Sequence, residues 1–514
     1  MLGLILLAVL ALSSVQAQTG AYTLNGGTAV QTSQTYAGTL ADQSAVYVLN
    51  AGNLTLTNCT ITKTGDASST DNSSQYGTNA GVLAKSAGTV TISGGTVTTN
   101  ASGGNGIFAS GTGSSISMSD GTISALGGNA HGVDVTYGGA ISLTNVDVTT
   151  KGASSSAIAT DFGGGTVTVR GGTISASATS SGSHSAGIYS TGMITVSGAT
   201  VTSLGDCGGV IDGGNSILLT NTALTGAQSG IKIWKTAPMT GTALVTINGG
   251  SLTAAGGDAF YVTGTTGNAA AAILMATGSA KITASSGCIV NVDSKSTAAF
   301  AASGESLVGN LFADATSTVT ATLQENTTIE GSMQRIALTL DSSSVWTVTE
   351  NSILTALIDP RGVLGTAITN IIGNGHNVHY DADLTANLYL GGLTYSLVNG
   401  GVLTPGSVDA VTQTQSAIPT ECVLHQNYPN PFNPSTTIAF SLTVDSRTTL
   451  TVYDCAGRQV ATPVNATLAA GNHQYAFDGS QLTSGVYFCR LTASPVSDAS
   501  ARAFTDVKKF TLLK

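Results

Sequence analysis

Charged and aromatic residues are scarce in this chain. Only 9% of the 514 residues are charged and 5% are aromatic. So few large side chains would not fill one compact core, and a chain of this length therefore needs several domains or a repeat array. Disorder is disfavoured because 41% of the residues are hydrophobic, whereas disordered chains combine low hydrophobicity with high net charge. The formal net charge of −10 and the lack of any Lys/Arg cluster argue against a nucleic-acid partner.

Cysteines are few, and no two of them form a CxxC pair. The six are Cys59, Cys207, Cys288, Cys422, Cys455 and Cys489. This spacing disfavours a zinc site and thioredoxin-like chemistry. Export would permit disulfides, and Cys455 with Cys489 is one conceivable pair because both lie near strand-like runs. The alternative is that the cysteines are small buried side chains, so the pairing stays open.

Long apolar runs are absent after the first residues. The sequence MLGLILLAVLALSSVQAQ (1–18) is short, apolar and ends in small residues, which predicts a signal peptide over residues 1–17 with cleavage between Ala17 and Gln18. A membrane anchor is the alternative, but about 12 apolar residues fall short of the ~20 that span a bilayer. One departure from the usual pattern is that no Lys or Arg precedes the run.

A nine-residue phrase recurs from residue 54 onward, at intervals of about 25 residues that indicate a solenoid. Each copy alternates apolar and small polar residues around a Gly, Asn or Asp pair. The alternation predicts a strand with one buried face, and the pair predicts a tight corner between two strands. The copies are LTLTNCTIT (54–62), VTISGGTVT (90–98), ISMSDGTIS (116–124), ISLTNVDVT (141–149), VTVRGGTIS (167–175), ITVSGATVT (194–202), ILLTNTALT (217–225) and VTINGGSLT (245–253).

A third short strand is expected in each repeat, so that three strands and three corners make one coil of a parallel β-helix. Coils would stack about 4.8 Å apart, with Val, Ile and Leu columns inside, where large aromatic side chains would clash. The insert after each third strand, for example residues 66–79, is expected to form the variable surface. The third strands are GIFAS (106–110), GVDVT (132–136), GIYST (187–191), GIKIW (230–234) and AFYVT (259–263).

Beyond residue 270 the phrase degrades, but short β runs continue at 317–323, 335–340 and 345–357, and residues 373–405 close the array. Trp346-Thr347-Val348 and the GNGH…YDA…LGG…Y pattern of the closing segment resemble the β-helical passengers of bacterial surface adhesins and autotransporters. The resemblance implies a β-helical architecture and a surface role, and about fifteen coils at the strand spacing would make a rod roughly 70 Å long. An autotransporter would also need membrane strands after residue 405. That pattern is not evident, so we expect another export route.

Proline is rare, yet three of the nine prolines fall in QNYPNPFNPSTT (426–437). We call these twelve residues the proline segment. A polar linker (404–423) precedes it, and six or seven short alternating runs with turns at Ala456-Gly457 and Ser484-Gly485 follow. They predict a small Ig-like β-sandwich over residues 424–514. The predicted fold class is therefore all-β, a right-handed parallel β-helix (18–403) followed by this sandwich.

Several motifs of the tail resemble the C-terminal (type A) sorting domain of cargo proteins of the bacterial type IX secretion system. Their residues are Asn427, Tyr428, Pro429, Asn430, Pro431, Phe432, Asn433, Pro434, Gly457, Gly485, Tyr487, Lys508, Lys509 and Lys514. The resemblance implies recognition by the outer-membrane secretion machinery, removal of the domain, and release or anchoring at the cell surface. Cys455 and Cys489 depart from the family pattern. An Ig-like domain without an address function is the alternative.

The β-helix sequence offers little to an enzyme. A Ca²⁺-dependent lyase needs clustered carboxylates and a basic residue, and a glycosidase needs two carboxylates on one face. The aspartates come about once per repeat at different phases, so we expect corner and loop positions and no shared site. They are Asp120, Asp134, Asp147, Asp161, Asp206 and Asp212.

Three weaker candidates remain. Asp161 and Arg170 are nine residues apart and come nearest to a catalytic pair. His376 and His379 are expected on opposite faces of a strand, which disfavours a metal site. The KIWK sequence (232–235) puts an aromatic ring among cations, where it would stack on a sugar, but a Trp packed against a neighbouring coil is the favoured interpretation.

The sequence therefore predicts no catalytic residue, no metal and no cofactor. It favours a secreted, surface-displayed structural or adhesive protein over an enzyme. The partners expected are the secretion machinery and a surface glycan or host-matrix ligand. The alternatives are a polysaccharide lyase or hydrolase, a glycan-binding module, and an ice-binding face made of Thr ladders.

Overall fold

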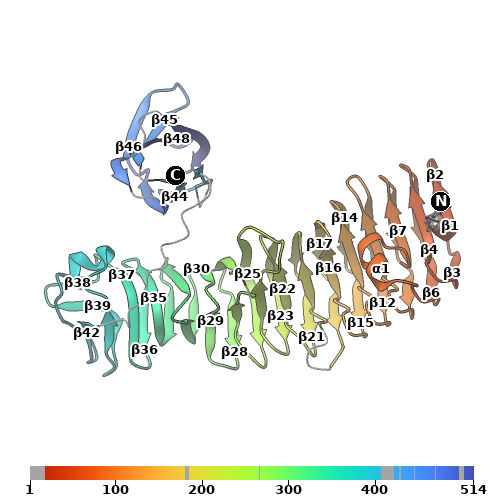
Figure 1. The fold of residues 1–514 in the computed structure, drawn as a ribbon, viewed down its shortest axis with the longest axis horizontal. Helices are drawn as coiled ribbons and strands as arrows, with labels where there is room; N and C mark the ends of the chain where they lie inside the picture. Colours follow the sequence, from red (N-terminus) through yellow and green to blue (C-terminus); the bar gives the residue numbers. More distant parts are fainter. Residues whose placement is uncertain are drawn as a thin grey trace, which may run out of the picture. The chain divides into compact units, whose positions relative to one another are not determined.

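The computed structural model describes residues 18–179, 184–265, 267–406, 422–427, 430–444, 446–468, 471–496 and 503–514. The chain divides into two compact units, Met1–Asp409 and Ala410–Lys514. The first is a parallel β-solenoid of about 15 turns, and the second consists of small antiparallel sheets (Figure 1). The all-β class and the predicted β-helix are confirmed. The Ig-like topology of the second unit stays a prediction.

The two strands of the recurring phrase form two separate ladders along the solenoid. The first-strand ladder consists of β2 (Thr28–Thr32), β5 (Asn53–Thr57), β8 (Thr89–Ser93), β11 (Ser115–Ser119), β14 (Gly139–Thr144), β17 (Gly165–Arg170), β20 (Met193–Ser197), β23 (Ser216–Gly226), β25 (Ala243–Ala254), β27 (Ala271–Thr277), β30 (Thr297–Ser303), β33 (Thr318–Gln324), β35 (Met333–Leu340), β37 (Ser352–Ile358), β40 (Val378–Tyr380) and β42 (Val402–Pro405). The second-strand ladder consists of β3 (Thr35–Gly38), β6 (Thr60–Lys63), β9 (Thr96–Thr99), β12 (Thr122–Ala125), β15 (Asp147–Thr150), β18 (Thr173–Ala176), β21 (Thr200–Ser203), the second halves of β23 and β25, β28 (Lys281–Ala284), β31 (Ser306–Val308), β34 (Thr328–Gly331), β36 (Val345–Val348), β39 (Ala367–Ile372) and β41 (Tyr395–Val398).

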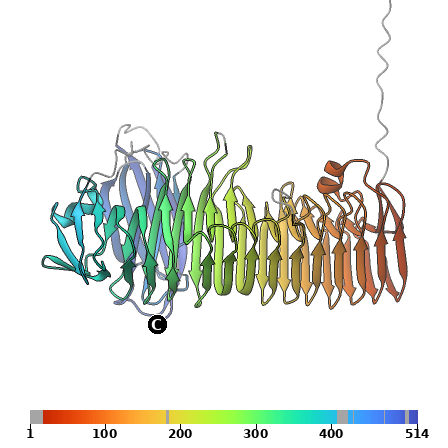
Figure 2. The same cartoon turned by 90° about the horizontal axis from the view of Figure 1, so that it is seen from below.

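The third-strand sheet carries the candidate site described below. Its strands are β1 (Thr19–Asn25), β4 (Gln43–Leu49), β7 (Val82–Lys85), β10 (Ile107–Ser110), β13 (Val133–Thr136), β16 (Ile158–Asp161), β19 (Ile188–Ser190), β22 (Gly209–Asp212), β24 (Ile231–Trp234), β26 (Phe260–Val262), β29 (Cys288–Val292) and β32 (Asn310–Ala313). Parallel pairing in register stacks each residue on its equivalent one coil away, as in Ile107 on Val133 and Val133 on Ile158. Figure 2 shows the coils side by side along the solenoid.

The corners of the coils confirm the turn prediction. Between the first and second strands, Gly94 and Gly95 have φ of 65° and 82°, and Asn145 takes the same left-handed region with φ of 52°. Only Gly and, less readily, Asn or Asp adopt this conformation without much strain. In β23 and β25 the strand runs through the corner, but Asn221 keeps a positive φ of 46°. The recurring Gly/Asn/Asp pair therefore sets where each coil bends.

The interior of the solenoid contains more than stacked Val, Ile and Leu. Phe260, Phe300, Trp346 and Tyr380 are fully buried in the coils beyond residue 259, so the expectation that large aromatic side chains would clash inside is wrong there. Phe260 and Phe300 lie 6.3 Å apart between ring centroids. The Trp346 indole N–H donates to the Gly331 carbonyl at 2.8 Å, which satisfies its polar atom inside the core.

In the N-terminal coils the longer inserts lie before the third strand, which corrects the sequence expectation there, whereas residues 235–242 and 263–270 follow the third strands β24 and β26, as expected. Residues 66–79 connect β6 to β7 and contain α1 (Thr70–Tyr76), a helix that the sequence did not predict. Ser69 caps its N-terminus by accepting from the Asn72 N–H at 3.2 Å, and Gly77 ends it with φ of 68°. Helix α1 packs against the third-strand sheet near β13, and Figure 1 shows it on the coils of the N-terminal half.

The C-terminal end of the solenoid is closed by a change of pairing. Strands β41 and β42 pair antiparallel, as do β38 (Val363–Leu364) and β39, and the 3₁₀ helix η1 (Thr385–Leu390) lies between them in sequence. Residues 373–405 therefore close the array as predicted, because an antiparallel hairpin interrupts the parallel stacking.

The C-terminal unit has two antiparallel sheets. One contains β43 (Val423–Leu424), β44 (Ser435–Leu442) and β47 (Gly471–Asp478), and the other contains β46 (Gln459–Leu468), β45 (Ser446–Asp454), β48 (Gly485–Pro495) and β49 (Phe504–Leu512). Both sheets contribute to one apolar core, in which Phe432, Phe477 and Phe510 pack with ring centroids 5.5–6.3 Å apart. Seven short strands agree with the six or seven that the sequence predicted.

None of the six cysteines, all of which lie among the described residues, forms a disulfide. The conceivable Cys455–Cys489 pair is wrong, because Cys489 is buried in the core while Cys455 is exposed in the turn after β45. Cys59, Cys207 and Cys489 are buried small side chains, as the alternative held.

Two predicted segments lie largely or wholly outside the described residues. The signal peptide (1–17), with Ala17, is one, and most of the linker (404–423) is the other. Gln18 is described, and its amide donates to the Thr78 carbonyl at 2.9 Å. Within the described part of the chain, no helix has the length and hydropathy of a membrane span.

Candidate functional site

A cavity of about 380 Å³ opens over the third-strand sheet. We call it the third-strand groove. Its floor consists of Tyr189, Val210, Lys232 and Trp234. Its walls are supplied by α1 and by described residues of the inserts before β13, β16, β19 and β22. The residues that line it are Asp71, Ser74, Asn129, His131, Ser154, Ser156, Asp161, Phe162, His184, Ala186, Tyr189, Asp206, Val210, Lys232 and Trp234.

The floor of the groove is built by stacking. Register pairs Tyr189 with Val210 and Val210 with Lys232, so these side chains form one outward column. Asp212 pairs with Trp234 in the neighbouring column. Tyr189 and Trp234 pack against the buried side chains Ala186, Cys207 and Val210. The floor is therefore apolar and aromatic, although it lies on the outside of the coils.

Lys232 places a cation over this aromatic floor. Its Nζ lies 4.8 Å from the Trp234 ring centroid and 6.0 Å from that of Tyr261, within the range of cation–π attraction. The Trp234 Nε1 atom is buried and has no hydrogen-bond partner among the described residues. Trp234 packs against side chains of neighbouring coils, as one interpretation of the KIWK sequence held, and it also lines the groove; its stacking on a sugar stays a prediction.

His131 supplies a fixed donor in the wall. Its Nδ1 accepts from the Ser156 N–H at 3.0 Å, and its backbone N–H donates to Asn105 Oδ1 at 2.8 Å. Burial lowers the pKa of His131 to about 4, so the ring is neutral near pH 7. A neutral ring that accepts at Nδ1 carries its proton on Nε2.

Three aspartates lie on the outward face of this one sheet. Asp134 is on β13, Asp161 ends β16, and Asp212 ends β22 in the same column as Asp161, two coils or about 10 Å away. The expectation that the aspartates occupy different phases is therefore wrong for Asp161 and Asp212, whereas Asp134 lies in the neighbouring column, opposite Ala159. Asp120 and Asp147 do lie at exposed corners, as expected.

Burial and mutual repulsion shift the ionisation of these carboxyl groups. Desolvation, with Asp161 nearby, raises the pKa of Asp134 well above its ordinary value, and both of its oxygens lack a hydrogen-bond partner among the described residues. Desolvation and the charge of Asp212 raise the pKa of Asp161 to about 6, although the Phe162 N–H, which donates to Asp161 Oδ1 at 2.9 Å, acts against the shift. Burial also raises the pKa of Tyr189.

The other candidates from the sequence do not form sites. Arg170 ends β17 in the first-strand ladder, whereas Asp161 is on the third-strand sheet. His376 lies in the turn before β40 and His379 is within that strand. Among the described residues, no group of three or more His, Cys, Asp and Glu side chains is placed to hold a metal ion.

Outward Thr and Ser side chains stack into two columns on the second-strand ladder. One column is uninterrupted and consists of Thr62, Thr98, Ser124, Thr149, Ser175, Thr202, Thr225, Thr253 and Thr283. The other column is broken by Asp147, Ala223 and Lys281. These interruptions make the face a poor match to the regular flat array that ice binding would use.

In the C-terminal unit, the structure brings together motif residues from opposite ends of the tail. The Phe432 N–H donates to the Thr511 carbonyl, and the Leu513 N–H donates to the Phe432 carbonyl, both at 2.9 Å. Asn430 Oδ1 accepts from the Thr511 N–H at 2.8 Å. The proline segment is therefore bound along the last strand, β49. Tyr428 and Pro429 lie outside the described residues.

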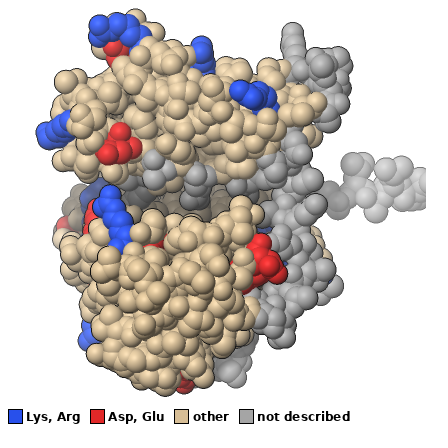
Figure 3. All heavy atoms as spheres, turned by 90° about the vertical axis from the view of Figure 1, so that its left-hand side faces the viewer, with Lys and Arg blue, Asp and Glu red and all other residues tan. Residues whose placement is uncertain are grey.

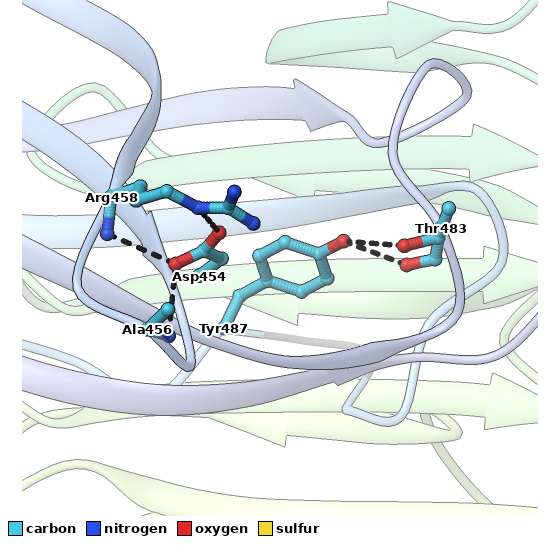
Figure 4. A network of polar contacts seen from close by, with 5 residues as sticks. All are labelled: Asp454, Ala456, Arg458, Thr483 and Tyr487. Carbon is cyan, nitrogen blue, oxygen red and sulfur yellow. Dashed lines mark hydrogen bonds and ion pairs between the residues drawn. The ribbon is translucent and has the colours of Figure 1, made fainter.

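The remaining motif residues build turns and strand ends. Asp454 organises the turn that contains Gly457, because its Oδ1 accepts from the N–H groups of Ala456 and Arg458 and its Oδ2 pairs with Arg458 Nε at 2.8 Å (Figure 4). Tyr487 Oη donates to the Thr483 carbonyl at 2.7 Å, which fixes the loop before Gly485.

Hydrogen bonds and an ion pair also hold the basic C-terminal residues and the first residues of the proline segment in place. Lys514 Nζ donates to the Ser480 carbonyl at 2.6 Å, and Lys508 pairs with Asp506 at 3.1 Å. The Lys509 carbonyl accepts from the Gln426 amide at 2.8 Å, while its own side chain is exposed. Asn427 is buried and donates to Thr436 Oγ1 at 2.9 Å, while Asn433 and Pro434 are exposed.

The outer face of the four-stranded sheet carries an exposed aromatic patch, which we call the β48 patch and define as Tyr453, Phe488, Arg490 and Val507. The guanidinium of Arg490 lies 4.7 Å from the Tyr453 ring centroid. Phe488 and Val507 are 37% and 48% exposed, and the patch surrounds a hollow of about 360 Å³. On the face seen in Figure 3, Lys, Arg, Asp and Glu side chains are scattered among uncharged residues.

Comparison with known proteins bears on the C-terminal unit. A family model described as "Secretion system C-terminal sorting domain" matches residues 426–499. No curated protein matches the chain. The match begins in the proline segment and extends through β48. The residues that build the apolar core and the turns of the C-terminal unit therefore belong to a domain that directs export.

Proposed function

We propose that this protein, a type IX secretion cargo with a parallel β-helical body, is displayed on the outside of the outer membrane in an adhesive, structural role. A cleaved signal peptide (1–17) starts its export, and the unit from residue 424 onward engages the secretion machinery at the outer membrane. The third-strand groove is the observation that carries the adhesive role, because it is a concave, partly aromatic surface with a few polar groups. Such surfaces are the usual form of ligand sites.

The β48 patch is our candidate for the surface that the secretion machinery reads. Exposed aromatic and Arg side chains are typical of interface anchors. Tyr453, Arg490 and Val507 project from three different strands onto one face, so folding of the unit is required to assemble the patch.

Hydrolysis of a bound polysaccharide is the second candidate, and one observation favours it. The pKa of about 6 for Asp161 suits a general acid near neutral pH, and Asp206 is a second carboxyl group in the same groove. Release of reducing ends from a polysaccharide by the purified chain, lost in Asp161→Asn, would establish this activity. Binding without turnover would leave the adhesive role.

The export proposal is tested by deleting residues 424–514. We expect the truncated chain to accumulate in the periplasm and to be absent from the surface, because the address is lost. Surface protease accessibility and cell fractionation measure both outcomes. The matched control is Phe312→Ala, which changes an exposed side chain of the β-helix and should be displayed normally. Normal display of the truncated chain would overturn the proposal.

A further inference from the structure

We propose that the third-strand groove binds a neutral oligosaccharide, that is, a chain of sugars without acidic groups. The inference deepens the proposed adhesive function and rests on it, since it names the ligand class of the same groove.

The length of the groove suits an extended ligand. Its lining runs from the insert before β13 to β24, which is five successive coils. At about 4.8 Å per coil, this lining is about 19 Å long, and the floor, which extends from β19 to β24, is about 10 Å long. The cavity of about 380 Å³ falls within the ~300–1,000 Å³ range of small-ligand sites. A narrow, elongated site of this kind matches a chain of sugar rings better than a single compact molecule.

The aromatic floor provides flat apolar surfaces for sugar rings. Trp234 and Tyr189 are both partly exposed and both rest on a buried apolar cluster, so their positions are fixed before a ligand arrives. Phe162 adds a third ring that is 39% exposed at the rim. Aromatic rings of this type supply large contact area at low conformational cost.

The polar groups around this floor match the hydroxyl groups of a sugar. His131 offers a neutral Nε2–H donor, and the buried Trp234 N–H has no acceptor among the described residues. Asp161 and Asp206 are carboxyl groups that accept from hydroxyls. Asp206 Oδ1 already accepts from the Cys207 N–H at 2.7 Å, so its position is fixed. A ligand with many hydroxyl groups satisfies these donors and acceptors together.

The charge of the groove selects against acidic sugars. Its lining contains three aspartates (Asp71, Asp161 and Asp206) and one Lys (Lys232), while Asp212 lies on the same sheet beside it. Lys232 is turned onto the Trp234 ring. A polyuronate or a sulfated glycan would therefore meet net negative charge without a matching cluster of cations.

The test measures binding of the full chain by titration calorimetry. The neutral probes are cellohexaose, mannohexaose and laminarihexaose, and the acidic probe is hexagalacturonate. We expect at least one neutral probe to bind more tightly than the acidic one. Trp234→Ala should weaken that binding by about tenfold or more, and Trp234→Phe, which keeps a ring, should weaken it less.

The matched control is Phe312→Ala. Phe312 is an exposed ring in the same outward column as Lys232, three coils away and outside the groove. Its loss should leave the affinity unchanged. Circular dichroism shows whether each variant is folded. The inference is overturned if the folded full chain binds no neutral probe, if it prefers hexagalacturonate, or if Trp234→Ala and Phe312→Ala have the same effect.

Surface display of Trp234→Ala on cells separates this inference from the proposed function. If the variant is displayed and cell adhesion persists without saccharide binding, the groove ligand is wrong and the adhesive role stands. If unaltered cells do not adhere although the chain binds the sugar, the adhesive role is wrong and the groove ligand stands.

Discussion

At the scale of single residues, stacking determines the chemistry of Asp161. The side chain ends a strand and is only partly buried, yet the coil two steps away places Asp212 in the same column. Desolvation and this neighbouring charge both favour the protonated form. A carboxyl group that would be ordinary on an isolated strand therefore titrates near pH 6.

Asp161→Asn should stabilise the β-helix above pH 6 and have little effect near pH 4. Below pH 4 the Asp161 carboxyl is protonated in both the folded and the unfolded chain. Between about pH 4 and 6 the carboxyl ionises in the unfolded chain but resists ionisation in the folded chain. The free energy of unfolding of the native protein therefore falls across this range, and the loss persists above pH 6. We expect a gain on the order of 1–2 kcal/mol at pH 8, because partial exposure reduces the full value of the shift. Urea denaturation at both pH values measures the difference between the two proteins.

The same substitution at an exposed corner is the control for that experiment. Asp147→Asn changes an exposed carboxyl group that accepts from the Thr173 N–H at 2.8 Å. Its pH dependence should not follow that of Asp161→Asn. An equal gain from both variants would mean that general charge repulsion, and not the column with Asp212, is responsible.

At the scale of elements, the proline segment and the last strand act as one unit. Phe432 is fully buried, and its backbone N–H and carbonyl form hydrogen bonds with Thr511 and Leu513 at the end of the chain. The first and last segments of the C-terminal unit therefore stabilise each other. Proline withholds N–H groups and limits the segment to edge pairing. The exposed β48 patch lies on strands that this core supports.

Phe488→Ala and Phe432→Ala should separate recognition from folding. Phe488 is 37% exposed in the patch, so its loss should reduce surface display severalfold with little change in the melting temperature of the unit. Phe432→Ala removes a buried ring at a cost of about 3–5 kcal/mol, so it should lower both stability and display. Thermal denaturation and immunoblots of surface fractions measure these outcomes. Normal display of Phe488→Ala would show that the machinery reads another surface.

At the scale of the whole β-helix, stability comes from contacts between neighbouring coils. Each strand pairs with its equivalents one coil before and after, so local contacts are repeated along the axis and few contacts join distant coils. Solenoids of this kind tolerate the loss of a whole repeat because nearest-neighbour interfaces re-form.

Deleting residues 297–317 should leave a folded β-helix, whereas deleting residues 297–307 should not. The first deletion brings Thr318 to the position of Thr297, with which it is in register, so β27 pairs with β33. The second deletion removes part of a coil and turns inward side chains toward solvent. Circular dichroism and limited proteolysis distinguish the two. If the variant that lacks residues 297–307 is folded, the prediction from the strand register is wrong.

The sequence by itself determined the coil and the address. The repeat period, the strand alternation and the Gly/Asn/Asp corners are local features, because side-chain direction and permitted φ depend on neighbouring residues. They predicted three strands per coil, the corners at Gly94-Gly95 and the closing segment. The tail motif, from Asn427 to Lys514, was recognisable because its residues recur in a fixed order.

The tertiary structure alone decided the groove. The sequence did contain a signal for part of the groove. When residues 158–161, 209–212 and 231–234 are aligned by their inward Ile and Val side chains, Asp161, Asp212 and Trp234 fall in one column. The groove also depends on α1 and on inserts of unequal length, whose paths no repeat defines. Its residues are far apart in sequence and meet only when coils stack about 4.8 Å apart. Stacking also determined which aspartates lose water and gain a charged neighbour. In the C-terminal unit, backbone hydrogen bonds between Phe432 and the end of the chain join the two ends of the tail.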